Sequence, residues 1–205
     1  MKKKIILLIC MLVMSTGLLS GCTEESTQVE TEYDELKTEM QQNEINRINF
    51  EKMMFKGIRK NIHGDYSYGY ATCDHENAGT NYDAGYLDVA ITYYDSADVV
   101  YAMANNFYKE AESYFSRAKK FAPNLDMKEL ASLMEDEAKY YALVTSALHQ
   151  CCEYMSSASL SYYYGDYDIG DEQLIIANSF IDEHDRLILP TENATTDIDS
   201  LLDLL

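Results

Sequence analysis

An alternation of alanine and aromatic residues between residues 87 and 118 constrains the fold of this chain more than any other feature. Steps of three and four residues connect Leu87, Ala90, Tyr94, Ala97, Tyr101, Ala104, Tyr108, Ala111, Phe115 and Ala118. This spacing predicts one long α-helix with a single apolar face. Small residues in such a face let a second helix approach closely while the rings fill the space between, as in antiparallel coiled coils. We therefore interpret the stripe as core, in preference to a ligand or cofactor box.

Three other segments show helical spacing. Residues 33–62 carry Ile45, Ile48, Phe55, Ile58 and Ile62. Residues 126–163 follow Pro123 and carry Ala131, Met134, Ala138, Tyr141, Leu148, Cys152 and Met155. A shorter helix before Pro190 carries Leu174, Ile175, Ala177, Phe180, Ile181 and Leu187. We expect Gly64 to end the first of these helices, and glycines among tyrosines predict loops at residues 64–83 and 165–170.

Four helices joined by short loops predict an all-α, up-and-down helical bundle that contains a long antiparallel hairpin. An alternative comes from Tyr108, Ala111, Phe115, Ala118 and Pro123, whose spacing resembles the second helix of a tetratricopeptide repeat, with a turn at residues 105–106. That resemblance implies a fold of repeated α-hairpins. The first-helix signature of the repeat is missing at residues 99 and 102, so we prefer one continuous helix.

The start of the chain has the pattern of an export signal. Three lysines at residues 2–4 precede an apolar run over residues 5–19, and Leu19-Ser20-Gly21-Cys22 follows. This motif resembles the lipobox of prokaryotic lipoproteins, which implies cleavage before Cys22 and a diacylglycerol anchor on its thiol. The alternatives are a plain secretory signal or an uncleaved transmembrane helix, but the apolar run is shorter than the ~20 residues that span a bilayer.

On this interpretation the chain has four parts: a signal peptide (1–21), a lipidated tether (22–32), a helical bundle (33–190) and an acidic tail (191–205) with Leu201, Leu202, Leu204 and Leu205. The mature protein is expected on the outer side of the cell membrane. The helical faces are filled either within one chain or between the chains of a homo-oligomer.

The net charge argues against nucleic-acid binding. The chain has 16 Lys and Arg against 35 Asp and Glu, and loss of three signal-peptide lysines takes the net charge from −19 to −22. Binding to nucleic acid depends on basic residues that neutralise phosphates, so it is not expected here. The same net charge predicts repulsion from an anionic bilayer.

The two predicted loops lie together at the end of an up-and-down bundle away from the membrane. They bring together Tyr66, Tyr68, Tyr70, Tyr82, Tyr162, Tyr163, Tyr164 and Tyr167, with the carboxylates Asp65, Asp83, Asp166 and Asp168. Tyrosine among Gly, Ser and Asn is typical of recognition surfaces, because the ring offers contact area at low entropic cost. The alternative is that these are ordinary turn residues with half-buried rings.

Three cysteines remain once Cys22 carries lipid. In an oxidising compartment we expect Cys73 to form a disulfide with Cys151 or Cys152. The alternative is a metal site of Cys73, His75, His149 and Cys152, whose sulfur and nitrogen ligands suit zinc.

The sequence contains no paired-His helix motif, phosphate-binding glycine loop or nucleophile elbow. We therefore expect a protein without a cofactor that binds or scaffolds rather than catalyses, with an envelope protein or extracellular ligand as partner. The alternative is a metal-binding envelope protein or a metal-dependent enzyme that uses the Cys and His cluster.

Overall fold

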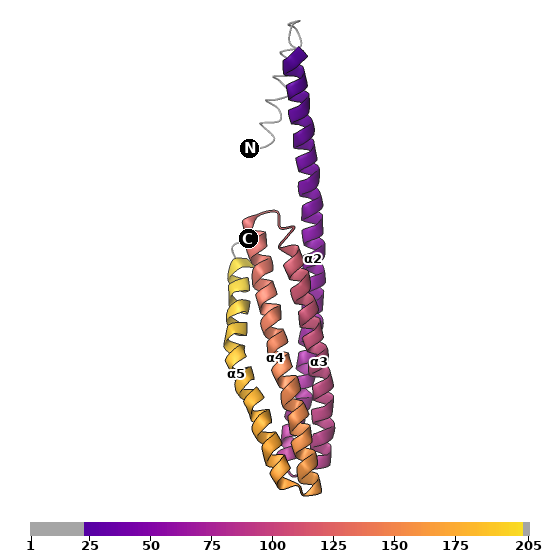
Figure 1. Cartoon of the computed structure of the whole chain (residues 1–205), viewed down its shortest axis with the longest axis vertical. Helices are drawn as coiled ribbons and strands as arrows, with labels where there is room; N and C mark the ends of the chain where they lie inside the picture. The colour runs from indigo at the N-terminus through magenta and orange to yellow at the C-terminus, as the bar shows by residue number, and fades with distance from the viewer. Residues whose placement is uncertain (1–22, 203–205) are drawn as a thin grey trace. The chain divides into compact units, whose positions relative to one another are not determined.

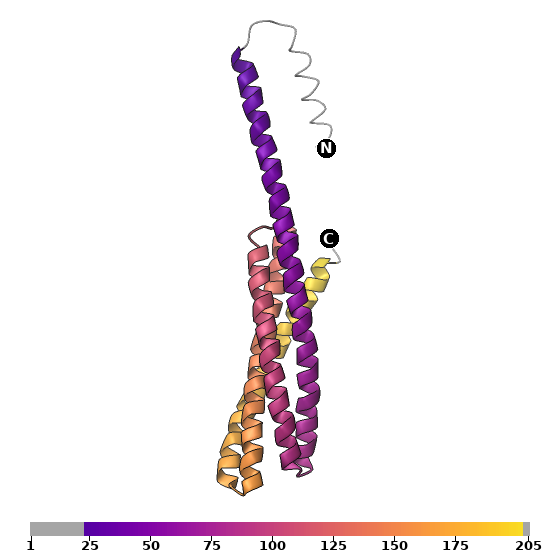
Figure 2. The same ribbon diagram turned by 90° about the vertical axis from the view of Figure 1, so that its right-hand side faces the viewer.

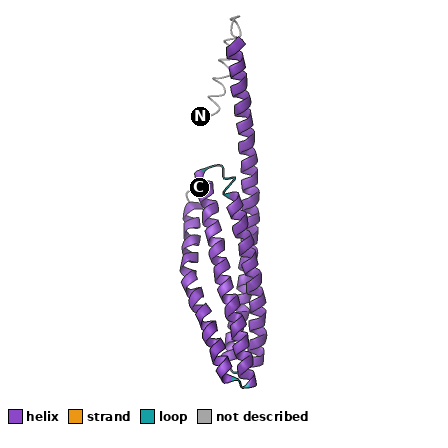
Figure 3. Cartoon of the chain, in the orientation of Figure 1, coloured by secondary structure: helices purple, strands orange, loops and turns teal. Residues whose placement is uncertain are grey.

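The computed structural model describes residues 23–202 of the chain, with side chains described from residue 32 onward. These residues form four α-helices and no strand: α2 (Thr23–Asp83), α3 (Leu87–Ala118), α4 (Leu125–Tyr164) and α5 (Tyr167–Leu202) (Figures 1 and 3). The helices run alternately up and down, which confirms the predicted all-α bundle. The lipobox, residues 19–22, lies outside the described residues.

The chain divides into two compact units, one that ends at Glu44 and one that begins at Ile45. In the first unit the described backbone is helical from Thr23, and the side chains of residues 32–44 are all exposed. Residues 22–32 are the predicted tether, and those from Thr23 onward are helical although they are polar. Straight-chain residues such as Glu and Gln lose little entropy in a helix, so polarity alone does not prevent one.

The predicted loop over residues 64–83 is wrong, because α2 continues as a helix to Asp83. Two glycines of α2, Gly57 and Gly64, leave space for large side chains of α3. A Cβ atom on Gly64 would lie 2.6 Å from Cε1 of Tyr108, and one on Gly57 would overlap the ring of Phe115. Close packing against two large rings therefore outweighs the low helix propensity of glycine.

These two contacts set an antiparallel register between α2 and α3. Steps of seven residues lead from them to two further pairs of a small and a large residue: Ala71 with Tyr101, and Ala78 with Tyr94. All four of these residues belong to one buried cluster, and each is at most 1% exposed. The heptad stripe predicted on α3 is confirmed, and every member after Leu87 is buried.

The buried tyrosines of α3 also bond to α2 through their hydroxyls. The hydroxyl of Tyr108 donates to Asp65 at 2.8 Å, and that of Tyr101 lies 3.3 Å from the hydroxyl of Thr72. Burial raises the pKa of both phenols, and for Tyr108 the neighbouring Asp65 carboxylate adds to the shift. A buried tyrosine needs such a partner, so these bonds fix the rings in the helical register. Because α3 is one helix, the tetratricopeptide alternative is not supported.

The stripe predicted to be the core face of α2 lies on its exposed side. Its members are between 39% and 69% exposed: Ile45, Ile48, Phe55, Ile58 and Ile62. The face that packs instead carries Phe50 and Met54, followed by the small residues opposite the α3 rings. The most apolar stripe of this helix is therefore not its core stripe.

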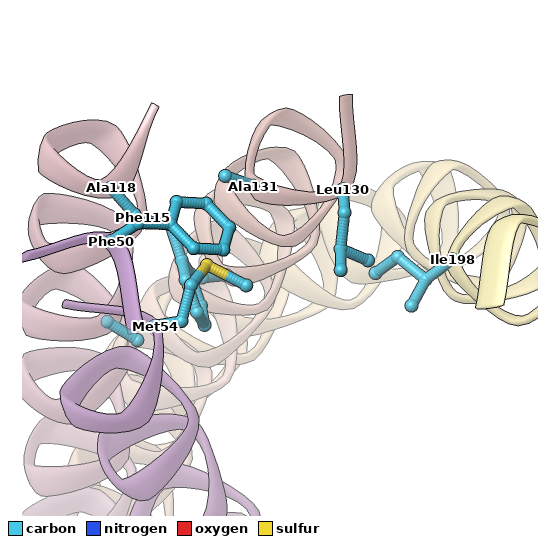
Figure 4. Packing of buried hydrophobic residues seen from close by; sticks show 9 residues of the cluster. Phe50, Met54, Phe115, Ala118, Leu130, Ala131 and Ile198 are labelled. Atoms are coloured by element: carbon cyan, nitrogen blue, oxygen red, sulfur yellow. The ribbon is translucent and has the colours of Figure 1, made fainter. Parts of the chain in front are cut away.

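All four helices contribute to the core at one end of the bundle. Figure 4 shows this cluster: Phe50 and Met54 from α2, Phe115 and Ala118 from α3, Leu130 and Ala131 from α4, and Ile198 from α5. Asn124 caps the start of α4 by accepting a 2.8 Å hydrogen bond from the backbone N–H of Met127. The turn after Pro123 is thus where the sequence predicted it.

Helix α5 continues through Pro190, where the sequence predicted its end and the start of a separate tail. Proline removes one backbone donor and costs helix stability. Beyond it, Thr191, Ala194 and Ile198 are buried in steps of three and four. Packing of this apolar edge on the bundle compensates for the lost hydrogen bond, so the helix reaches Leu202.

Glu137 of α4 is a charged residue in the interior, only 9% exposed. The hydroxyl of Thr195 on α5 donates to its carboxylate at 2.8 Å, and the amide of Asn61 on α2 donates at 3.4 Å. Burial raises the pKa of this carboxyl above its ordinary value. The Oδ1 atom of Asn61 is itself buried without a hydrogen-bond partner.

Candidate functional site

Both short connections at one end of the bundle are built in the same way. Gly85 after α2 and Gly165 after α4 have φ angles of 81° and 82°, which only glycine adopts without strain. At each one the glycine N–H donates to the carbonyl three residues back, and the next N–H donates to the carbonyl five residues before it. This is the Schellman motif, and it reverses the chain within two or three residues. The following helix begins at once.

Tyr162 connects the two turns. Its ring centroid lies 6.2 Å from that of Tyr82 on α2 and 6.1 Å from that of Tyr167 at the start of α5. Its hydroxyl donates to Asp171 at 2.6 Å, and this bond raises the pKa of the phenol. Gly170 lies against the ring, since a Cβ there would be 2.6 Å from Cε1. The two turns lie at the same end of the bundle (Figures 1 and 2), and the ring contacts of Tyr162 connect them.

We call this surface the tyrosine-rich end, composed of Tyr82, Tyr86, Tyr162, Tyr163, Tyr164 and Tyr167. Four of its rings are mostly exposed, at 63% for Tyr86, 56% for Tyr163, 71% for Tyr164 and 66% for Tyr167. Tyr163 and Tyr164 pack edge to face with centroids 5.4 Å apart. The end thus offers rings that are held in place by their neighbours and accessible to a partner.

The other predicted site tyrosines do not lie at this end. Tyr66 and Tyr70 are 68% and 72% exposed, but they precede Tyr82 by 12 to 16 residues of helix, roughly 18–24 Å. Tyr68 faces the interior, with its ring centroid 6.0 Å from Tyr101 and 6.4 Å from Tyr141. The expected group of tyrosines is therefore split, because residues 64–83 are helical and not a folded-back loop.

The carboxylates show the same split. Asp83, Asp166 and Asp168 are exposed at the tyrosine-rich end as predicted, whereas Asp65 bonds to Tyr108 along α2. Sequence reasoning missed Tyr86 and Asp171. Tyr86 lies between Gly85 and the periodic stripe that starts at Leu87, next to a predicted loop, and that position could have identified it.

Charge is divided unevenly along the bundle. Tyr108 contacts Gly64 and Tyr141, and Glu137 contacts Thr195, so these residues lie at about the same level along the bundle. Residues 65–107 and 141–192 lie on one side of that level and form one half. This half contains the tyrosine-rich end, and it has 16 Asp and Glu but only one Lys or Arg, Arg186. The opposite half, residues 45–64, 108–140 and 193–202, has 11 basic and 10 acidic residues. The negative charge of the bundle is therefore concentrated around the tyrosine-rich end.

The predicted disulfide is not formed in the structure. Cys73 is an exposed thiol on α2, whereas Cys151 and Cys152 are buried on α4 and all three are free. Burial raises the pKa of Cys151 to about 11 and that of Cys152 higher still. The α4 thiols behave as small apolar core residues, since Cys152 packs in the cluster of Tyr94 and Tyr101.

The four residues of the alternative metal site are not brought together. The ring of His75 packs against Tyr94 and Tyr101 on α3, and His149 pairs with Asp98. Among residues 32–202, no group of three or more His, Cys, Asp or Glu side chains is placed to hold a metal ion. His75 and His149 are thus engaged in helix packing.

Comparisons with family models, with curated proteins and with solved structures gave no match for this chain. Within the described part of the chain, no helix combines the length and apolarity needed to cross a membrane.

Proposed function

We propose that this chain is a lipid-anchored, extracytoplasmic protein of the cell envelope that binds or scaffolds a partner through its tyrosine-rich end. The lipobox supports the anchor at Cys22. The observation that supports the binding surface is the group of four exposed rings beside Tyr82 and Tyr162, two half-buried rings whose contact connects both tight turns. Rings of this kind supply most of the contact energy in many protein interfaces.

The surrounding charge favours a basic partner. Asp83, Asp166 and Asp168 are exposed beside the rings, in the half of the bundle that contains a single basic residue. Carboxylates bind Lys and Arg, and tyrosine faces attract cations within about 6 Å. We therefore propose an envelope protein with a Lys- and Arg-rich segment as the partner, and a binding role without catalysis.

The test compares two pairs of equally exposed tyrosines. Y164A/Y167A removes rings of the tyrosine-rich end, and Y66A/Y70A removes rings of similar exposure elsewhere on the surface. Each variant, displayed on cells, is cross-linked to neighbouring envelope proteins, and the products are quantified. We expect the first pair to lose the cross-linked partner and the second to retain it. Equal effects of both pairs, or no effect of either, would contradict the proposed surface.

The anchor is tested separately. A C22S variant removes the thiol that accepts the lipid, so we expect wild-type protein, and not C22S, to incorporate a labelled fatty acid in cells. Incorporation by C22S at wild-type levels would contradict the anchor at Cys22 without bearing on the tyrosine-rich end.

A further inference from the structure

The outward side of α2 carries apolar residues that nothing in the bundle covers. Ile48, Phe55 and Ile62 follow one another at steps of seven and are 51%, 69% and 47% exposed. Phe55 is the only exposed phenylalanine among the described side chains. We call these three residues, with the interleaved Lys52 and Arg59, the α2 outer face.

Basic residues are interspersed with this apolar stripe. Lys52 lies four residues after Ile48 and three before Phe55. Arg59 lies four residues after Phe55 and three before Ile62. Residues three and four apart are neighbours on a helix surface. Both cations are exposed, and neither has an ion-pair partner among the described side chains. The nearest acid, Glu51, is paired with Arg47 at 2.8 Å.

A second copy of the chain does not fit this face well. A coiled-coil seam needs apolar residues three or four positions after each member of the heptad stripe. After Ile48 these positions are Glu51 and Lys52, after Phe55 they are Ile58 and Arg59, and after Ile62 they are Asp65 and Tyr66, so at least one charged residue stands at every step. A helix with an apolar stripe and adjacent unpaired cations instead suits the boundary between lipid headgroups and acyl chains.

We propose that the α2 outer face lies on the anionic phospholipid surface of the membrane that carries the protein. This inference rests on the proposed lipid anchor at Cys22, 26 residues before Ile48, which holds the chain at the membrane. Ile48, Phe55 and Ile62 enter the headgroup region, and Lys52 and Arg59 contact lipid phosphates. Each basic residue near an anionic surface strengthens binding about fivefold.

The acidic net charge does not prevent this contact. The tyrosine-rich end begins at Tyr82, 27 residues of helix after Phe55, which is about 40 Å. Electrostatic screening acts over about 8 Å at physiological ionic strength. Residues 45–64 themselves have five basic residues and one acidic residue, so the local charge at the face is positive, whereas residues 23–44, which precede the face, have one basic and eight acidic residues.

The chain contains no tryptophan, so one introduced indole reports on its own surroundings. F55W places it on the face, and I175W places it on α5 in the acidic half at a position that is also 69% exposed. The mature lipidated variants are reconstituted into phosphatidylglycerol vesicles with brominated acyl chains, which quench tryptophan on contact. We expect strong quenching of Trp fluorescence in F55W and little in I175W, and loss of the F55W quenching in 1 M salt or in phosphatidylcholine vesicles.

Addition of K52Q/R59Q to F55W tests the cations. Removal of two basic residues should reduce about thirtyfold the ratio of molecules whose α2 outer face contacts the vesicle to molecules whose face does not. Equal quenching in F55W and I175W, quenching that survives K52Q/R59Q, or a concentration-dependent blue shift of F55W without vesicles would overturn the proposal. The last result would assign the face to a second copy.

Failure of the lipid anchor is distinguished from failure of the face. Mass spectrometry of the protein shows whether Cys22 carries lipid, whatever the α2 outer face does; a chain without lipid shows that the anchor has failed. That chain is then mixed directly with the same vesicles at low salt, and the comparison of F55W with I175W decides the proposal in the same way.

Discussion

Replacement of Gly64 by alanine tests whether close approach of α2 to the α3 tyrosines holds the bundle together. The added Cβ would lie 2.6 Å from Cε1, 2.8 Å from Cζ and 2.9 Å from Cδ1 of Tyr108. Ordinary carbon–carbon contacts are about 3.5–4.0 Å, so the overlap is about 1 Å. The ring cannot easily yield, because Tyr108 is fully buried and its hydroxyl donates to Asp65 at 2.8 Å.

The expected magnitude follows from opposing effects. Overpacking of a dense core costs about 1–3 kcal/mol. Displacement of the ring also weakens the bond from Tyr108 to Asp65, at a cost of about 1 kcal/mol. Alanine gains about 1 kcal/mol over glycine in a helix interior. We therefore expect G64A to lower the free energy of unfolding by about 2 kcal/mol, which corresponds to a fall in Tm of roughly 4–8 °C.

Gly69 provides the matched control in the same helix. No atom lies within 4 Å of a Cβ added there, so G69A gains helix propensity without a clash. We expect it to raise the free energy of unfolding by about 0.5–1 kcal/mol. Urea unfolding followed by far-UV circular dichroism measures both variants. If G64A proves as stable as G69A, the reasoning from the α2–α3 register is refuted.

Two further predictions concern buried titratable groups. Because burial raises the folded-state pKa of Glu137 above its unfolded value of 4.5, the stability it contributes is present below pH 4.5 and is lost as pH rises through the folded pKa. We expect E137Q to be more stable than wild type at pH 7, with a difference in Tm that vanishes near pH 4; a difference that does not change with pH would contradict this. Among the three described thiols, only the exposed Cys73 should react with a maleimide in the native protein, and Cys151 and Cys152 should react once the protein unfolds. Mass spectrometry of partially labelled protein distinguishes the three sites.

The parts of the fold that the sequence predicted well are those in which local pattern and tertiary packing agree. The stripe on α3 from Ala90 to Ala118 is buried throughout, and the α4 stripe includes the buried Ala131, Ala138 and Leu148. The up-and-down topology followed from helix number and short turns. It also placed Tyr82, which lies on α2, and the tyrosines after residue 161 at the same end of the bundle.

The predictions that failed depended on local rules that packing overrides. Local rules predict that Gly64 and Pro190 end helices, yet both lie inside helices because the neighbouring positions are buried against other elements. The structure does not bring the proposed cysteine and histidine partners together, for a related reason. Sequence spacing does not tell which side of a helix faces the interior, and Cys73 lies outside while Cys152 lies inside.

The amino-acid sequence is enough to predict that the chain is helical, that α3 packs through an alternation of alanine and aromatic residues, and that acidic residues dominate. Which face of α2 meets α3 depends on how the helices pack. Helix α2 has a stripe of Ile48, Phe55 and Ile62 and a second stripe that includes Gly57 and Gly64. The less apolar stripe is the one that packs, because the rings of Phe115 and Tyr108 need space that only small residues leave. The apolar stripe of α2 therefore remains exposed. The packed face is determined by shape complementarity between the helices, rather than by hydrophobicity along one helix.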